Sequence, residues 1–148
     1  MGISVSIGAD GAPCNNNLNM FTEMRLASLI QKPIYDPIVM DAKQMIKLVT
    51  IEGAKALHLG DEIGSIEVGK KADLQLLNLE KANHSMLNSD ENLYSSIVYA
   101  ADKSDVDSVM VEGKWVVRNG KNMIYNEQEM IQKGRAELKE LLKRAKID

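Results

Sequence analysis

The chain opens with strict alternation, because apolar side chains are separated by serines over residues 3–7. This two-residue period predicts a strand over residues 3–8, since successive side chains of a strand point to opposite faces. Residues 9–17 are then rich in turn and cap residues, which predicts a polar loop directly after the strand.

Helical periodicity follows over residues 18–32, where apolar side chains fall roughly on one face. Asn17 is expected to cap this helix, because its side chain can accept a hydrogen bond from a free backbone N–H. A second helix is expected from Asp41, since Gln44 three residues later completes a capping box. Thr50 is expected to cap a short third helix.

The pattern changes near residues 60–64, which makes this stretch the best candidate for a domain boundary. Residues 74–79 predict a largely buried strand, and residues 80–96 are polar and predict a loop crossing. A hairpin is expected over residues 106–117, with its turn at Glu112 and Gly113. An Asn-Gly pair supplies a further turn just beyond this hairpin.

The order of elements predicts an α/β chain in three parts. Residues 1–60 hold the first strand and helices, residues 61–122 are mostly β, and residues 123–148 hold a charged amphipathic helix over residues 127–146. With 148 residues, the chain is too short for a complete eight-stranded (β/α) barrel, which typically needs about 250 residues.

Composition narrows the class of protein further. The net charge of −3 argues against a nucleic-acid binder, whose surface usually carries clustered basic residues. The single cysteine, Cys14, excludes an intramolecular disulfide framework and has no evident base nearby in sequence. No run of about 18 apolar residues predicts a membrane span, and the first residues lack the features of a secretory signal. We therefore expect a cytoplasmic protein with no membrane or nucleic-acid partner.

Asp10 is the most suggestive carboxylate, because it comes just after the predicted strand. The carboxyl ends of strands are where α/β folds build their sites. A carboxylate there can ligate a divalent metal and can accept a proton from metal-bound water. On spacing alone, a capping role in a turn is the simpler interpretation, so the residues by themselves leave both roles open.

The other polar candidates have simple structural interpretations. Asparagines at residues 15–17 can bind a polar substrate but more commonly cap a helix. Glu23 and Arg25 are interpreted as solvated helix charges. His58 is expected to be structural and His84 to be exposed in a polar loop, and their separation gives no tightly spaced pair of metal ligands.

Four ordered motifs resemble one enzyme family. They are GADGAPCNNNLNMFTEMRLA at residues 8–27, TIEGAKAL at residues 50–57, EIGSIEVGKKADL at residues 62–74 and DVDSVMVEGK at residues 105–114. Their order is similar to that of the amidohydrolase superfamily, and specifically of the branch that holds guanine deaminases, S-adenosylhomocysteine deaminases and triazine hydrolases. Ala9 stands where the family usually has Thr, and Cys14 where it has Ser.

The resemblance implies a chemical role for Asp10. In the family, the matching aspartate follows the eighth barrel strand, binds the catalytic divalent metal and handles the proton of the attacking water. Asp10 is therefore implied to be both the catalytic residue and a metal ligand, with zinc or iron as the metal. The implied reaction is hydrolytic cleavage of a non-peptide C–N bond in a purine, nucleoside or triazine, a small heterocyclic substrate whose binding residues stay unassigned.

The resemblance also implies that this chain is a C-terminal fragment of a TIM-barrel amidohydrolase. It covers the last barrel strand and its helices, part of the small β-sandwich domain and a C-terminal helix. The family's histidine ligands lie upstream of the aspartate and have no counterpart here. The isolated chain is therefore expected to be inactive and to hold no metal by itself, with the N-terminal half of the enzyme as its missing partner.

A second hypothesis belongs to a different class. The segment can act as a non-catalytic module that oligomerises or binds a partner, because the unpaired strand over residues 3–8 presents an edge that proteins rarely leave open. A homo-oligomer would cover that edge. The sequence leaves both hypotheses open.

Overall fold

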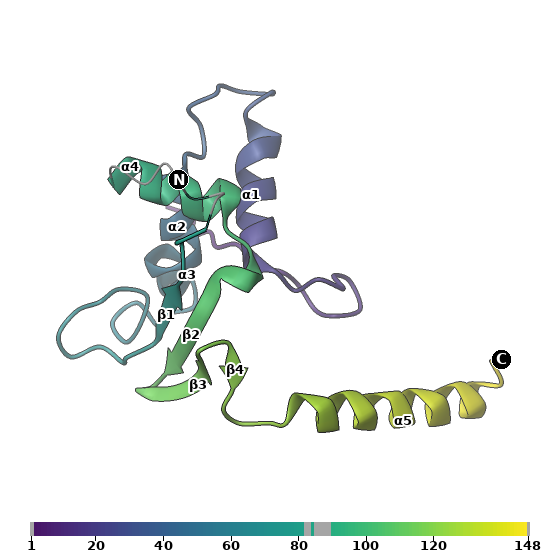
Figure 1. Ribbon diagram of the computed structural model, residues 1–148. Helices are drawn as coiled ribbons and strands as arrows, with labels where there is room; N and C mark the ends of the chain where they lie inside the picture. Colours follow the sequence, from purple (N-terminus) through teal and green to yellow (C-terminus); the bar gives the residue numbers. More distant parts are fainter. Residues whose placement is uncertain (1, 82–83, 85–89, 148) are drawn as a thin grey trace.

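The computed structural model describes residues 2–81, 84 and 90–147, and Figure 1 shows a group of helices beside a small sheet. The helices are α1 (Met20–Gln31), α2 (Ala42–Val49), α3 (Ile51–Ala56), α4 (Asp90–Ser95), the π-helix η2 (Ser96–Ala100), the 3-10 helix η3 (Lys103–Asp105) and α5 (Glu127–Ala145). The strands are β1 (Leu74–Leu77), β2 (Val106–Val111), β3 (Lys114–Arg118) and β4 (Lys121–Asn122).

Residues 3–8 form no strand in this structure, contrary to the sequence-based prediction, and the first strand among the described residues is β1. Ile3 and Val5 are exposed, and only Ile7 of the alternating apolar side chains packs against the core. A β-strand forms only where its backbone hydrogen-bonds to a neighbouring strand. The prediction is therefore wrong for this structure, because none of the described strands pairs with residues 3–8.

Helix caps agree only partly with the predictions. Asp41 caps α2 as expected, since its side chain accepts a hydrogen bond from the N–H of Gln44. For α1 the cap is Asn19 instead of Asn17, because Asn19 has the extended backbone of a cap and accepts from the N–H of Phe21. Thr50 precedes α3, but its hydroxyl donates back to the carbonyl of Ile46 and caps nothing.

The sheet is an antiparallel meander in the order β1-β2-β3-β4. The predicted hairpin is confirmed, with Glu112 and Gly113 both at positive φ between β2 and β3. Asn119 and Gly120 repeat this geometry between β3 and β4. Two consecutive residues with positive φ make a type I′ turn, whose twist matches that of the flanking strands.

Among the described residues, the core lies between α1, α2 and η2, and the strands add only partly buried side chains such as Leu77 and Val106. Its buried apolar residues are Phe21, Met24, Ala42, Met45, Val98 and Ala101. Two of them, Val98 and Ala101, lie in η2 and directly after it. Both follow residues 80–96, for which the sequence predicted a polar loop. That loop prediction is wrong over residues 90–96, which are helical, and part of the remainder lies outside the described residues.

Helix α5 confirms the predicted C-terminal helix but buries none of its residues. Figure 1 shows it running away from the sheet. Its apolar side chains, including Ile131, Leu138 and Leu141, are exposed. Within the described part of the chain, no helix is both long and apolar enough to cross a bilayer.

Replacing Met45 by Ala tests the core assignment. Met45 is fully buried between the helices, so Met45→Ala should lower the free energy of unfolding by about 2–4 kcal/mol through lost burial and a cavity. Met123→Ala changes an exposed methionine and should cost less than about 0.5 kcal/mol. Urea unfolding followed by circular dichroism measures both, and equal losses would contradict this core.

Candidate functional site

Asp10 lies in an exposed loop between the N-terminal segment and α1. Its backbone is left-handed, with φ of 59°, and its Oδ1 accepts a hydrogen bond of 2.7 Å from the N–H of Gly11. The N–H groups of Cys14 and Asn15 both donate to the carbonyl of Gly11 and close a tight turn. Asp is one of the few non-glycine residues that adopt this backbone readily, so the loop holds its carboxylate in a defined direction.

Asn15 anchors this loop to α1. Its side-chain amide donates to the carboxylate of Glu23 at 2.7 Å, and its Oδ1 accepts from the N–H of Asn17 at 3.0 Å. Glu23 is therefore not the solvated helix charge that the sequence suggested. Of the three asparagines, Asn15 has this structural role, while Asn16 and Asn17 are exposed.

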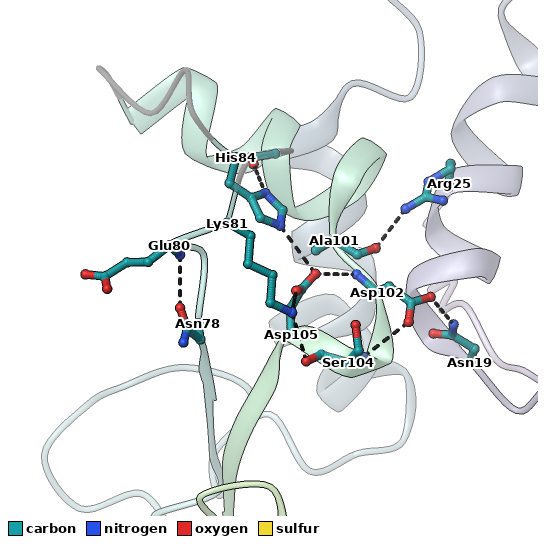
Figure 2. A network of polar contacts seen from close by, with 11 residues as sticks. Asn19, Arg25, Asn78, Glu80, Lys81, His84, Ala101, Asp102, Ser104 and Asp105 are labelled. Atoms are coloured by element: carbon teal, nitrogen blue, oxygen red, sulfur yellow. Dashed lines mark hydrogen bonds and ion pairs between the residues drawn. The ribbon is translucent and has the colours of Figure 1, made fainter.

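Arg25 also differs from its prediction as a solvated charge. Its guanidinium donates to the carbonyl of Val98 at 3.3 Å and to that of Ala101 at 2.8 Å. These carbonyls lie at the C-terminal end of η2, where helices leave acceptors without partners. Arg25 therefore holds α1 against η2 (Figure 2).

His84 is buried, contrary to the prediction that it is exposed, with only 3% of its surface accessible. Its Nδ1 lies 2.5 Å from the hydroxyl of Ser96, and its Nε2 lies 3.3 Å from Oδ2 of Asp105. The other oxygen of Asp105 forms an ion pair with Lys81 (Figure 2). The sequence offered one signal for this cluster, the Asp-x-x-Asp spacing of Asp102 and Asp105, which forms a capping box at η3.

The environment of Asp105 strongly favours its charged form. The hydrogen bond from Lys81, followed by the backbone N–H of Asp102 at 2.8 Å, lowers the pKa of the Asp105 carboxyl to about 2. Asp102 in turn accepts a hydrogen bond of 3.2 Å from the side chain of Asn19, the cap of α1. This network therefore joins the start of β2 to the start of α1.

Ser96, His84 and Asp105 contain the residue types of a hydrolytic triad, but their arrangement favours a structural role. A catalytic aspartate orients its histidine, whereas Asp105 is already held by Lys81 and by the N–H of Asp102. The apolar groove between the helices and the sheet is lined by other residues. The cluster therefore acts as a fixed internal connection.

That groove has a volume of about 690 Å³ and lies between the helices and the sheet. Its walls are mainly apolar and come from α1, α2, the loop over residues 63–66 and β1. Met24, Ile66, Leu74 and Leu77 are among the residues that line it. Asp10 is not part of the groove, so the candidate catalytic carboxylate and this cavity are separate features.

The described residues do not fit a metal ion by themselves. No group of three or more His, Cys, Asp or Glu side chains among them can hold one. Zinc sites in proteins take three or four protein ligands. His84 is engaged in the internal network, and His58 is exposed at the end of α3. Asp10 can therefore be at most one ligand of a site that other residues complete.

Comparison with known proteins identifies close relatives. The model of a family described as "Amidohydrolase family" matches residues 1–116. The 5-methylthioadenosine/S-adenosylhomocysteine deaminase of Thermodesulfovibrio yellowstonii is 44% identical over 89% of this chain and 30% of its own length. The 5'-deoxyadenosine deaminase of Methanobrevibacter smithii is 41% identical over 97% of this chain and 33% of its own length.

A solved structure gives the same result. The adenosine deaminase of Xanthomonas campestris, crystallised with bound zinc, matches with a TM-score of 0.85 and 33% identity. The match covers 90% of this chain and 30% of the deaminase. The chain thus spans about a third of the length of the proteins that it matches.

Removing the Asp105 carboxylate should change the response of stability to acid. Its pKa is lowered, so its stabilising contribution is complete above the ordinary pKa and is lost as the pH falls from about 4 to about 2. Asp105→Asn should lower the free energy of unfolding by about 2–4 kcal/mol at pH 7 and weaken this acid dependence. Urea unfolding at several pH values tests this, with Asp61→Asn, at an exposed position, as the control. An unchanged acid dependence would contradict the role of Asp105.

Proposed function

Because this chain belongs to the amidohydrolase family, we propose that it forms the C-terminal segment of a metal-dependent deaminase of purine nucleosides. The relatives named above are deaminases of adenosine-type compounds, which supports this substrate class. The zinc in the Xanthomonas campestris structure supports zinc over iron as the metal. The remainder of the site would come from the part of the enzyme that this chain does not span.

The placement of Asp10 is the observation that carries this proposal. Its carboxylate is exposed, none of the ion pairs among the described residues engages it, and the N–H of Gly11 sets its direction. Asp10 is therefore proposed as the one metal ligand and catalytic carboxylate that this chain contributes.

The chain's other residues have a supporting part in this proposal. Glu23 fixes the Asp10 loop through Asn15, and Arg25 fixes α1 against η2. Among the described residues, helices α1 to α3 precede residue 60 and strands β1 to β4 follow it, which supports residues 1–60 as the end of the barrel. Residues 61–122 are then part of the small β domain, and residues 123–148 hold the terminal helix.

Reconstitution with the rest of a relative tests the role of Asp10. The chain is produced together with the part of the Thermodesulfovibrio yellowstonii deaminase that it does not match, and ammonia release from 5-methylthioadenosine is measured. Asp10→Asn should lower kcat/KM by about 100-fold or more and reduce bound zinc, because a ligand is lost.

Asp36→Asn is the matched control for this experiment. Asp36 is also an exposed loop aspartate whose Oδ1 accepts a backbone N–H, here that of Ile38 at 2.8 Å. Its replacement should leave activity and zinc content within about twofold of the unchanged chain. Full activity of the Asp10→Asn complex would refute the proposed role.

The isolated chain should release no ammonia from adenosine-type nucleosides and should retain no stoichiometric metal after dialysis. The physical reason is that one carboxylate cannot form a zinc site. Ammonia assays and elemental mass spectrometry of the purified chain measure both quantities. Deamination at enzyme-like rates would contradict the proposal, and an inactive reconstituted complex with zinc bound would favour the non-catalytic module.

A further inference from the structure

The loop that carries Asp10 buries little of its own surface. Over residues 10–18, Asn15 is partly buried and every other residue is exposed. A loop with few buried contacts opens easily unless hydrogen bonds hold it in place. The position of this loop therefore depends on the contacts of Asn15.

A single hydrogen bond joins this loop to α1 among the described residues. Nδ2 of Asn15 donates to Oε1 of Glu23 at 2.7 Å, and the other hydrogen bonds of residues 10–18 stay within the loop. Because the acceptor is a carboxylate, this hydrogen bond is stronger than one between two neutral groups. Asn15 and Glu23 together are called the positioning pair below.

Helix α1 gives Glu23 a firm support. Arg25, two residues later, donates to two carbonyls at the C-terminal end of η2 (Figure 2). Ser28, one turn further on, is fully buried and donates to the carbonyl of Met40 at 2.7 Å. Buried polar contacts of this kind hold a helix in one place, because breaking them leaves unpaired groups inside the protein. Glu23 is therefore a fixed point to which the loop is attached.

The positioning pair reaches Asp10 through the backbone. The N–H of Asn15 donates to the carbonyl of Gly11 at 3.0 Å, and the N–H of Gly11 donates to Oδ1 of Asp10 at 2.7 Å. We infer that Asn15 and Glu23 are positioning residues for the reaction, and that they set the direction of the Asp10 carboxylate. This inference rests on the proposed function, in which Asp10 is the catalytic carboxylate.

The chemistry of the pair explains its residue types. Oδ1 of Asn15 accepts from the N–H groups of Asn17 and Leu18 at 3.0 and 3.4 Å, while its Nδ2 donates to Glu23. An amide can do both at once, whereas a carboxylate only accepts. A second carboxylate at position 15 would therefore lose the donor and repel Glu23.

Exchanging the polarity of the pair tests the inference in the reconstituted complex described above. Asn15→Asp should lower kcat by about 10- to 100-fold with KM changed less than about threefold, because a small displacement of a reacting group slows the reaction. Glu23→Gln alone keeps an acceptor and should cost less than about fivefold. The double variant Asn15→Asp with Glu23→Gln restores a donor and an acceptor, so kcat should return to within about fivefold of the unchanged complex.

Asn16→Asp is the matched control, because it adds the same charge at an exposed neighbouring position. It should change kcat by less than about twofold. Full activity of Asn15→Asp, an equal loss from Asn16→Asp, or a double variant that is no more active than Asn15→Asp would each overturn the inference. Circular dichroism checks that all variants are folded.

Hydrogen exchange of the isolated chain gives a readout that does not depend on activity. The amides of Cys14 and Asn15 donate to the carbonyl of Gly11 and report whether the loop is closed. They should exchange at least about tenfold faster in Asn15→Asp and slow down again in the double variant, while the amides of α2 stay unchanged. Loop amides that exchange equally in all variants would contradict the inference.

These results are separable from the test of function. If the Asp10→Asn complex is fully active while the pair still controls loop exchange, only the proposed function is contradicted. If Asp10→Asn abolishes activity and Asn15→Asp leaves kcat unchanged, only this inference is contradicted.

Discussion

The carboxylate of Asp105 connects the sheet to the group of helices beside it. It binds Lys81 and His84 from the segment after β1, and it accepts the N–H of Asp102 just before β2. Through Asp102 and Asn19, the same network reaches the first turn of α1. Because a buried carboxylate is costly without partners, these groups must stay together for the fold to persist. The network therefore connects the start of β2 to the start of α1.

The molecule has much exposed apolar surface compared with its small core. The side chains of Leu29, Ile34 and Ile38 near α1, and of Leu138 and Leu141 on α5, all face solvent. Folded proteins usually cover such surfaces, since each buried apolar side chain stabilises by about 1.5–3 kcal/mol. A chain that spans about a third of its relatives' length is expected to carry surfaces that the remainder covers.

This chain contributes few candidate catalytic groups and many residues that support them. Its candidate is the carboxylate of Asp10, which accepts a hydrogen bond from the N–H of Gly11. The hydrogen bond between Asn15 and Glu23 anchors the loop that carries it. The chain does not offer a complete set of ligands among its described residues. The buried His84 network resembles a reactive cluster in composition, yet its partners are those of a structural connection. Residue type alone therefore does not identify a site.

The sequence by itself determined the features that depend on neighbouring residues. The cap at Asp41, the turns at Glu112-Gly113 and Asn119-Gly120, and helix α5 follow from local hydrogen bonding and backbone preference, and the family motifs singled out Asp10. Tertiary structure decided what depends on distant contacts. Residues 3–8 need a partner strand, Arg25 binds carbonyls 73 and 76 positions away, and His84 contacts Asp105, 21 positions away. Local patterns carry no information about such partners, because the partner's position is set only when the chain folds.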